Sequence, residues 1–252
     1  MKRFYKIFFV MIVFASFLVV CPYSMSQEEH IGKITFFMGE IKINKAGTKN
    51  WQPVSLDMPL NSGDSLTTGK ESRLEIKYTS GSIVRVGENS QYQVFLKDKA
   101  DEKKSSKIVS DISLGKLWAN VRGIFSTSQN LEVRSPTAVM AIRGTVVHFN
   151  AAATKTDVYV YQGKADVAAV KGVLDKPPAA MKPVQVQAPT EVQAPQEVAG
   201  PKEVTLAEWT SIVAGEMISV TPDGKYSTSS FDVEAIDDEW VKWNKERDKA
   251  LQ

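Results

Sequence analysis

The sequence has 252 residues, with 31 lysines and arginines against 29 aspartates and glutamates, a formal net charge of +2 and a single cysteine. Three of the basic residues and none of the acidic ones lie in residues 1–26, so the rest of the chain carries 28 bases and 29 acids, a net charge of −1. This balance gives no clustered basic face for nucleic acid, and one cysteine excludes a disulfide framework.

Residues 1–26 predict a secretory signal peptide. A basic start precedes an apolar core at residues 7–20, and small residues follow it. The core is shorter than the roughly 20 apolar residues that cross a bilayer as a helix. We therefore expect cleavage between Ser26 and Gln27 rather than an uncleaved anchor, and a mature protein that is periplasmic or secreted.

Cys21 offers an alternative N-terminus. The stretch LVVC is close to a lipid-attachment box, but such boxes have a small residue before the cysteine and this chain has Val20. A lipid anchor at Cys21 is therefore the alternative to ordinary cleavage. After cleavage at Ser26 the mature chain would have no cysteine, no thiol active site and no membrane span.

From residue 31 to residue 170, short alternating segments are separated by glycine turns. In SRLEIKY, the apolar Leu74, Ile76 and Tyr78 alternate with charged residues, which predicts a half-buried strand. Similar runs recur along this segment and again in GEMISVTP, and no long apolar helix interrupts them. The sequence predicts an all-β fold of many short strands, and a sandwich, a barrel or a solenoid-like stack would each fit.

Residues 171–204 depart from this pattern. They repeat Gln-Ala-Pro, lack aromatic side chains and contain too many prolines to pair in a sheet. We interpret them as an exposed insertion between a β-domain at 27–170 and its closing β segment at 205–228. The alternative is a spacer or docking arm.

Residues 229–252 predict an amphipathic helix. Val233, Ile236, Trp240 and Trp243 recur at spacings of three and four, and acidic residues precede basic ones, as the helix dipole favours. We expect this stripe to pack on its own domain. The alternative is that Trp240 and Trp243 form a surface for a partner protein or a glycan.

Groups that could carry catalysis are sparse. Only two histidines occur, His30 and His148, so a histidine-rich metal site is disfavoured, and no nucleophile elbow or phosphate-binding motif is present. An acidic pair, Asp64 with Glu75 or Glu88, is the route to hydrolysis that the sequence leaves open. We expect no enzyme activity, no cofactor and no metal, with a carbohydrate- or peptidoglycan-processing enzyme as the alternative.

The stretch SPTAVMAIRGTVVHFN, residues 135–150, places Arg143 in an otherwise apolar, strand-like run. An unpaired arginine buried there would be costly, so we expect carboxylate or carbonyl partners and a role in tying strands together. Gly144 beside it would allow a bulge or a close backbone approach. A ligand anchor is the alternative interpretation of Arg143.

Several blocks of the sequence together resemble the FecR-domain family. SPTAVMAIRGTVVHF, with Arg143, Gly144 and Thr145 as its signature, is followed by TDVYVYQGKADV, a run of alternating valines with a glycine turn. PLNSGDSLTTGKESRLEIKYTSGSIVRVGENSQYQV and ISLGKLWANV precede them in the family's order and spacing, and VAGEMISVTPDG is similar to its closing strand.

The resemblance implies a bacterial envelope protein that acts by binding. FecR-type proteins are typically sensors in which a periplasmic β-domain receives a signal from an outer-membrane transporter and a cytoplasmic segment controls a sigma factor. Only six residues precede the apolar core here, so we expect a secreted, stand-alone form without the cytoplasmic segment. The expected partner is an envelope protein or polysaccharide, and the expected role is signal reception or envelope scaffolding.

Overall fold

The computed structural model describes residues 30–98, 106–121, 131–170, 209–235 and 238–250. The predicted signal peptide, its cleavage site at Ser26 and Gln27, the alternative lipid site at Cys21 and the proline-rich insertion lie outside the described residues.

In the described residues, seventeen strands form two facing sheets that share the long strand β9 (Ser106–Asn120). Sheet A contains, in spatial order, β4 (Pro59–Leu60), β1 (Gly32–Met38), β6 (Arg73–Tyr78), β7 (Ile83–Val86), β9, β12 (Val146–Ala151), β13 (Thr156–Gln162), β16 (Glu216–Val220) and β17 (Tyr226–Ser230). Sheet B contains β3 (Trp51–Pro53), β2 (Ile41–Asn44), β5 (Ser65–Thr68), β8 (Gln91–Asp98), β9, β10 (Leu131–Arg134), β11 (Ala138–Ile142), β14 (Lys164–Ala169) and β15 (Trp209–Val213).

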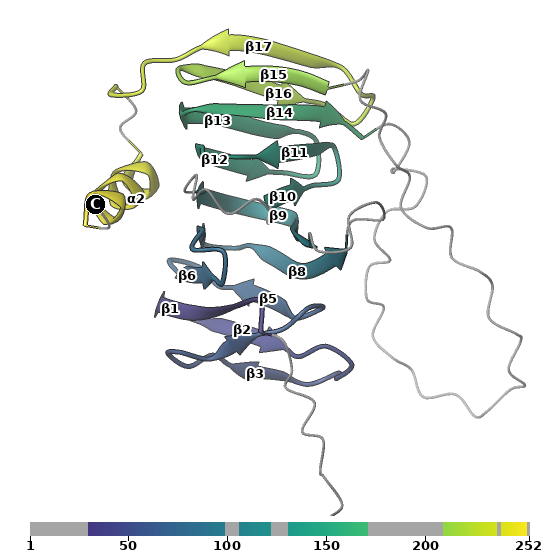
Figure 1. Ribbon diagram of the computed structural model, residues 1–252, viewed down its shortest axis with the longest axis vertical. Helices are drawn as coiled ribbons and strands as arrows, with labels where there is room; N and C mark the ends of the chain where they lie inside the picture. Colours follow the sequence, from purple (N-terminus) through teal and green to yellow (C-terminus); the bar gives the residue numbers. More distant parts are fainter. Residues whose placement is uncertain (1–29, 99–105, 122–130, 171–208, 236–237, 251–252) are drawn as a thin grey trace, which may run out of the picture.

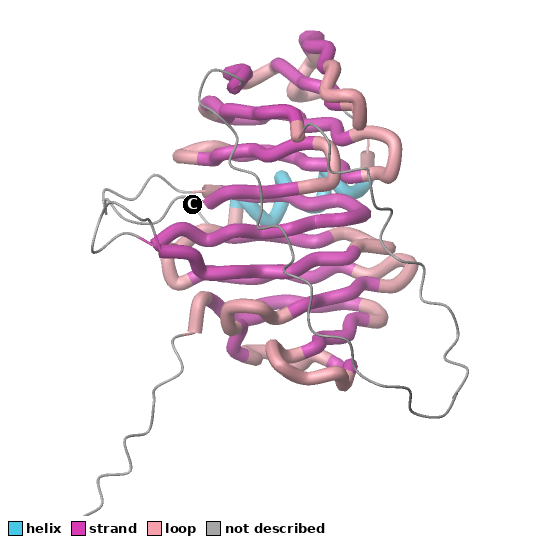
Figure 2. Tube along the Cα trace, turned by 90° about the vertical axis from the view of Figure 1, so that its right-hand side faces the viewer, coloured by secondary structure: helices cyan, strands magenta, loops and turns pink. Residues whose placement is uncertain are grey.

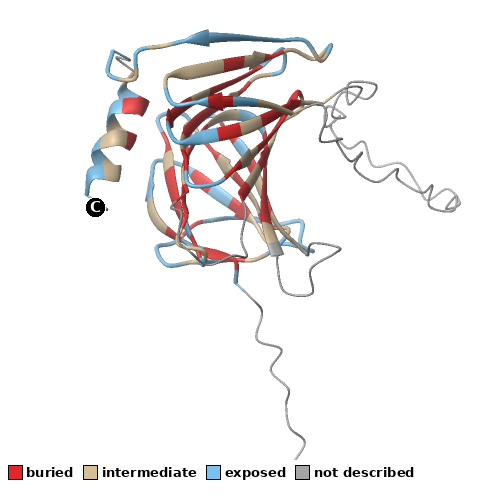
Figure 3. Ribbon diagram, turned by 45° about the horizontal axis from the view of Figure 1, so that its top comes forward, coloured by how far each residue is buried: buried red, intermediate tan, exposed pale blue. Residues whose placement is uncertain are grey.

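The chain builds both sheets together by passing back and forth between them. Strands therefore stack along the long axis in nearly sequential order, from β3 and β1 at one end to β15 and β17 at the other (Figures 1 and 2). Period-two alternation turns one side of each strand inward, and these apolar side chains form a single core between the sheets. Figure 3 shows buried residues in strands along most of the stack, while β17 is exposed along its whole length.

This architecture confirms the predicted all-β fold with a C-terminal helix. The sequence left three arrangements open. The barrel is excluded, because the sheets are open, and the strands stack as in a sandwich or solenoid. The pairings between described strands are antiparallel, with one exception, the parallel pair β9–β10.

Strand β9 links the two sheets because it bends at Gly115. Residues before Gly115 pair with β8 in sheet B, whereas Gly115 to Asn120 pair with β12 in sheet A. Gly115 has φ +110°, and a Cβ there would lie 2.0 Å from Ser90 Oγ, so a larger residue fits neither the conformation nor the space. The bend brings Trp118 onto the outer face of sheet A.

The strand-like run around Arg143 forms two strands, β11 and β12, with a corner between them. The chain leaves sheet B after Ile142, turns, and enters sheet A at Val146, and Arg143 lies exposed at that corner. Both arms of the corner are apolar because each faces the same core, so the sequence pattern did not reveal the break. Thr145 ties the corner: it is buried, and its Oγ1 donates to the Arg143 carbonyl oxygen at 2.9 Å and to the Lys164 carbonyl oxygen at 2.6 Å.

The C-terminal helix α2 (Glu239–Lys249) is shorter than the predicted 229–252. It begins where Asp238 caps it, with the side chain accepting a hydrogen bond of 2.8 Å from the Trp240 backbone N–H. Val233 lies in a turn before the helix, and Ile236 lies outside the described residues. The helix packs on the outer face of sheet A, opposite the core (Figure 1).

Candidate interaction site on the outer face of sheet A

A row of side chains crosses the outer face of sheet A from strand to strand. Each member is the register partner of the next, so the row runs perpendicular to the strands. We call this set the outer row: Phe36, Glu75, Arg85, Trp118, His148, Tyr159, Met217 and Ser229. Glu75 and Arg85 are its charged pair, Trp118, His148 and Tyr159 follow as rings, and α2 covers its middle.

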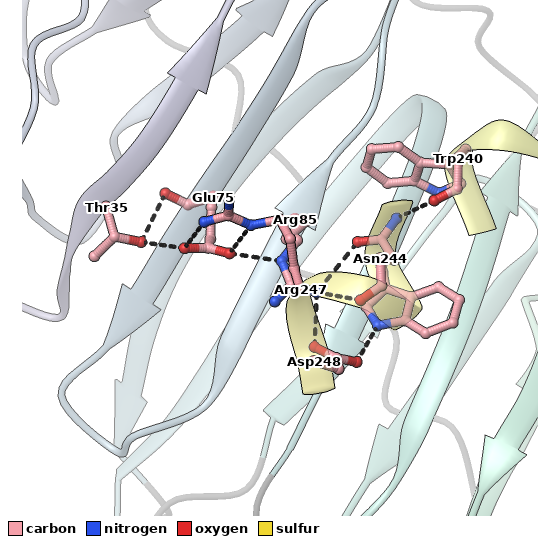
Figure 4. A network of polar contacts seen from close by, with 8 residues as sticks. Thr35, Glu75, Arg85, Trp240, Asn244, Arg247 and Asp248 are labelled. Atoms are coloured by element: carbon pink, nitrogen blue, oxygen red, sulfur yellow. Dashed lines mark hydrogen bonds and ion pairs between the residues drawn. The ribbon is translucent and has the colours of Figure 1, made fainter. Parts of the chain in front are cut away.

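Arg85 is the centre of the charged contacts with α2. Its side chain is completely buried, and its Nε donates to Glu75 Oε2 at 2.6 Å within the sheet. Its Nη1 reaches across to α2, where it donates to Asp248 Oδ1 at 2.7 Å (Figure 4). Because Asp248 Oδ2 also accepts from Trp118 Nε1 at 2.9 Å, two neighbours in the outer row hold one carboxylate of the helix.

Glu75 receives a second arginine from α2. Arg247 donates to both of its carboxylate oxygens, at 2.9 and 3.0 Å, and Thr35 Oγ1 donates to Oε1 at 2.8 Å. Burial raises the pKa of Glu75, but the hydrogen bonds from Arg247, Arg85 and Thr35 outweigh it and bring the pKa to about 2. Glu75 is therefore an ionised anchor near neutral pH and is not suited to be a general acid.

Aromatic rings form the remaining contacts between sheet A and α2. Trp118 lies 4.8 Å from Tyr161 between ring centroids, and both pack with Trp240 and Val241 of α2 in a cluster separate from the core. Trp240 stacks on Trp243 at 5.5 Å, and the Arg247 guanidinium lies 4.4 Å from the centroid of Phe36. Apolar burial and cation–π contacts thus attach the helix along its length.

Hydrogen bonding at this interface is incomplete. Five buried side-chain atoms of the described residues have no hydrogen-bond partner, and four of them belong to the α2 interface: Arg85 Nη2, His148 Nε2, Tyr161 Oη and Trp240 Nε1. A buried polar group left unpaired costs about 1–3 kcal/mol. The helix therefore covers this face while leaving part of its hydrogen-bonding capacity unused.

His148 lies in the outer row between Trp118 and Tyr159. It stacks on the Tyr159 ring at 5.5 Å between centroids and is 7% exposed. Burial lowers the pKa of His148 to about 4, which the charges of Asp238 and Asp157 oppose and that of Lys116 reinforces. The ring is therefore neutral near pH 7.

The two predicted tryptophans lie against the chain's own sheet, as the self-packing interpretation expected. Trp240 is only 5% exposed and so is no free surface while α2 is docked. The buried face of the helix differs from the predicted stripe, however, because it consists of Trp240, Val241 and Asn244, while Trp243 is half-buried. Asn244 Nδ2 donates to the Trp240 carbonyl oxygen at 2.7 Å, which allows an amide to be buried there.

The acidic residues proposed as a pair each have structural partners. Asp64 is buried and accepts from Lys45 Nζ at 2.9 Å and from the backbone N–H groups of Ala46 and Asn61. Glu75 is held in the α2 interface, and a Glu88 oxygen accepts from the backbone N–H of Glu71 at 2.9 Å. The contacts give none of these carboxylates the role of a catalytic partner to another.

Among the described residues, no three or more histidine, cysteine or acidic side chains gather in a way that could hold a metal ion. His30 is exposed, with its Nδ1 2.7 Å from Asn61 Oδ1. In the part of the chain that the structure describes, no helix is long and apolar enough to cross a membrane.

The sequence pointed to Arg143 as a buried arginine, but Arg143 is exposed. The buried arginine with carboxylate and carbonyl partners is Arg85, whose alternation with Val84 and Val86 reads as an ordinary solvent-facing position. Trp118 was a sequence signal that this face is covered. It alternates with the inward-facing Leu117 and Ala119, so it lies on the outer face, where a tryptophan is seldom left exposed.

The fold and the covered face define a two-sheet β-domain closed by its own C-terminal helix. Residues 64–166, from the start of β5 into β14, match the family model described as FecR protein. The chain thus contains a FecR domain, which confirms the resemblance seen in the sequence. The match includes most of the outer row but not α2.

Solved structures align with parts of this chain at low similarity. Two crystal structures from Parabacteroides distasonis ATCC 8503, provisionally described as an anti-sigma factor, align at 12% and 13% identity with a TM-score of 0.43, covering 68% of this chain and 61% of theirs. A cell surface anchoring domain aligns at 24% identity and a TM-score of 0.24, covering 25% of this chain and 82% of that domain. No curated protein matches this chain.

Proposed function

We propose that this protein is a non-enzymatic FecR-type interaction module of the bacterial cell envelope, either periplasmic or secreted, that receives a signal or scaffolds other envelope components. The observation that carries the proposal is the FecR domain at residues 64–166. Export by the signal peptide predicted at residues 1–26 would deliver the domain to that compartment.

The electrostatics of the described residues support binding over catalysis. A general acid or base works best when its pKa lies near the operating pH. Glu75 has a pKa of about 2 and is held by two arginines, and His148 is buried with a pKa of about 4. These groups stabilise the fold, and so they do not favour the carbohydrate- or peptidoglycan-processing alternative.

Affinity capture tests the function. Purified protein lacking the predicted leader is immobilised and exposed to detergent-solubilised envelope extract, with the same protein unfolded before coupling as the control. We expect an envelope protein or polysaccharide that, once purified, binds the folded protein saturably. Release of soluble fragments from purified peptidoglycan or polysaccharide, with no saturable partner, would favour the enzyme.

Export is tested separately by intact mass. We expect the exported protein to begin at Gln27, because the short apolar core and the serine at residue 26 fit signal-peptidase cleavage. A lipid mass at Cys21 would establish the anchored form, and a retained Met1 would contradict export by cleavage.

A further inference from the structure

We propose that α2 is a releasable cap, and that the face beneath it is the docking surface for an amphipathic helix of a partner protein that presents an acidic residue to Arg85 and Trp118. This deepens the proposed interaction function and rests on it. The face consists of the middle of the outer row, from Glu75 to His148, together with Tyr161.

The charges of the interface are distributed so that, when the helix leaves, each charged side chain keeps an oppositely charged neighbour on its own surface. On the sheet, Arg85 and Glu75 pair with each other at 2.6 Å. On the helix, Arg247 and Asp248 are adjacent residues of opposite charge. Separation therefore leaves one cation and one anion on each surface, whereas an interface with one sign on each side would expose two uncompensated patches.

The unpaired polar atoms also favour release. Three of them, Arg85 Nη2, His148 Nε2 and Tyr161 Oη, belong to the sheet, and the fourth, Trp240 Nε1, belongs to the helix. When α2 lifts, water can hydrogen-bond to all four. The three sheet atoms indicate the groups that a better-fitting occupant would carry, namely hydrogen-bonding side chains where α2 offers none.

Two hydrogen-bond donors on the sheet converge on one carboxylate, and this specifies an acidic residue in the partner helix. Arg85 Nη1 and Trp118 Nε1 come from adjacent strands and meet on the two oxygens of one carboxylate, at 2.7 and 2.9 Å. This arrangement recognises a carboxylate in a fixed position rather than negative charge in general. A docked partner must place an aspartate or glutamate where Asp248 now lies.

The spacing of α2 shows why the occupant is a helix. Trp240, Asn244 and Asp248 recur every four residues, so they lie along one helical face and meet the outer row. A partner helix would present a large apolar residue, a polar residue and an acidic residue at the same intervals.

Peptide binding to the full-length chain tests the proposal. The probe is a fluorescein-labelled peptide with the sequence of residues 231–252, which stands in for a partner helix, and its binding is followed by anisotropy. The host is a full-length Trp240→Ala/Asp248→Asn variant, whose own helix is weakened while the sheet face is unchanged. We expect this host to bind the peptide at least tenfold more tightly than the wild-type chain, because its own cap competes less.

Two further variants test specificity. A peptide carrying Asp248→Asn should lose at least tenfold in affinity for the same host, because Arg85 and Trp118 then face an amide. The matched control is a peptide carrying Glu234→Gln, which removes a carboxylate that is exposed in the structure and should bind as the unmodified peptide does. Equal binding by all three peptides would overturn the proposed recognition.

Hydrogen exchange supplies an independent readout on the wild-type chain. We expect α2 amides to exchange at least a hundredfold faster than amides of β9 and β12, because α2 opens without unfolding the sheets. Equal protection of α2 and these strands would overturn the releasable cap. A dimer that forms at peptide-binding concentrations would instead make α2 of a second copy the occupant, and would overturn the partner-protein assignment.

These measurements use no envelope extract. Peptide binding without a captured envelope partner would therefore refute the proposed function while leaving the docking face in place. A captured partner that binds equally to chains with intact and weakened α2 would leave the function in place and refute this face as its site.

Discussion

The space between the two sheets and the interface under α2 are both buried, but they are built from opposite chemistry. Aliphatic and aromatic side chains fill the space between the sheets, and its hydroxyl groups bond one another, since Tyr78 and Tyr92 each contact Ser110. The α2 interface contains two arginines, two carboxylates and four unpaired polar atoms. A buried interface is therefore not always a permanent one, because buried polar groups without hydrogen-bond partners oppose its burial.

The comparison also separates what holds each region together. Burial of apolar side chains stabilises the packing of the two sheets on each other. In the α2 interface, a buried ion pair adds little net stability, because its charges must leave water. The docking of α2 thus depends mainly on Trp240 and Val241, while the ion pairs of Arg85 set the position of the helix. We expect substitutions in the two regions to differ in size and in which part of the molecule they unfold.

The largest effect should come from the core between the sheets. Phe149 is fully buried there, and Phe149→Ala should lower the free energy of unfolding by about 3–5 kcal/mol, because a large cavity replaces packed side chains. Sheet and helix should unfold together in chemical denaturation, seen by circular dichroism and tryptophan fluorescence. Loss of α2 alone would contradict the assignment of Phe149 to the shared core.

Arg85→Met should have the next largest effect. It removes donors from Glu75 and Asp248, but each of these keeps another donor, Arg247 and Trp118 respectively. We expect a loss of about 3 kcal/mol, near the low end for a broken buried pair. Arg143→Met is the matched control, and since Arg143 is exposed its effect should stay within about 0.5 kcal/mol. A larger loss for Arg143→Met would restore the original interpretation of that residue.

Acidification should weaken the α2 interface before the core. The folded pKa of His148 is about 4 against an ordinary 6.5, so the unfolded state takes up the proton first as pH falls. Stability should therefore decrease between pH 6.5 and 4, by up to about 3 kcal/mol. Glu75, with a pKa of about 2 against 4.5, should add a further loss only between pH 4.5 and 2.

The test is denaturation of the wild-type chain and a His148→Phe variant across this pH range. The phenylalanine keeps a ring beside Tyr159 but cannot be protonated, so the loss above pH 4.5 should become smaller. An unchanged pH dependence would show that other groups cause it.

The smallest effect should come from the helix cap. Asp238→Ala removes the acceptor of the Trp240 N–H and should destabilise α2 by about 1 kcal/mol. Hydrogen exchange should show faster exchange in α2 and no change in β9 or β12. Asp232→Ala is the control, because Asp232 caps an exposed turn before the helix, and acceleration of α2 by that variant would argue against a specific capping effect.

Local patterns in the sequence were sufficient for the class of fold. Alternation in stretches such as Leu74 to Tyr78 predicts one apolar face per strand, and the spacing of Trp240 and Trp243 predicts a helix, because both periodicities follow from backbone geometry. The blocks of the FecR resemblance were likewise visible in the chain itself, and the family match falls on them.

Only the tertiary structure decided which outward-facing residues are buried. Arg85 occupies a polar position in its strand, and it is buried because α2 contacts it from 163 residues further along the chain. Arg143 occupies an apolar run, and it is exposed because the chain turns there from sheet B to sheet A. The sequence determines the period of each strand, but burial of its outer face depends on distant segments, and local periodicity carries no information about those.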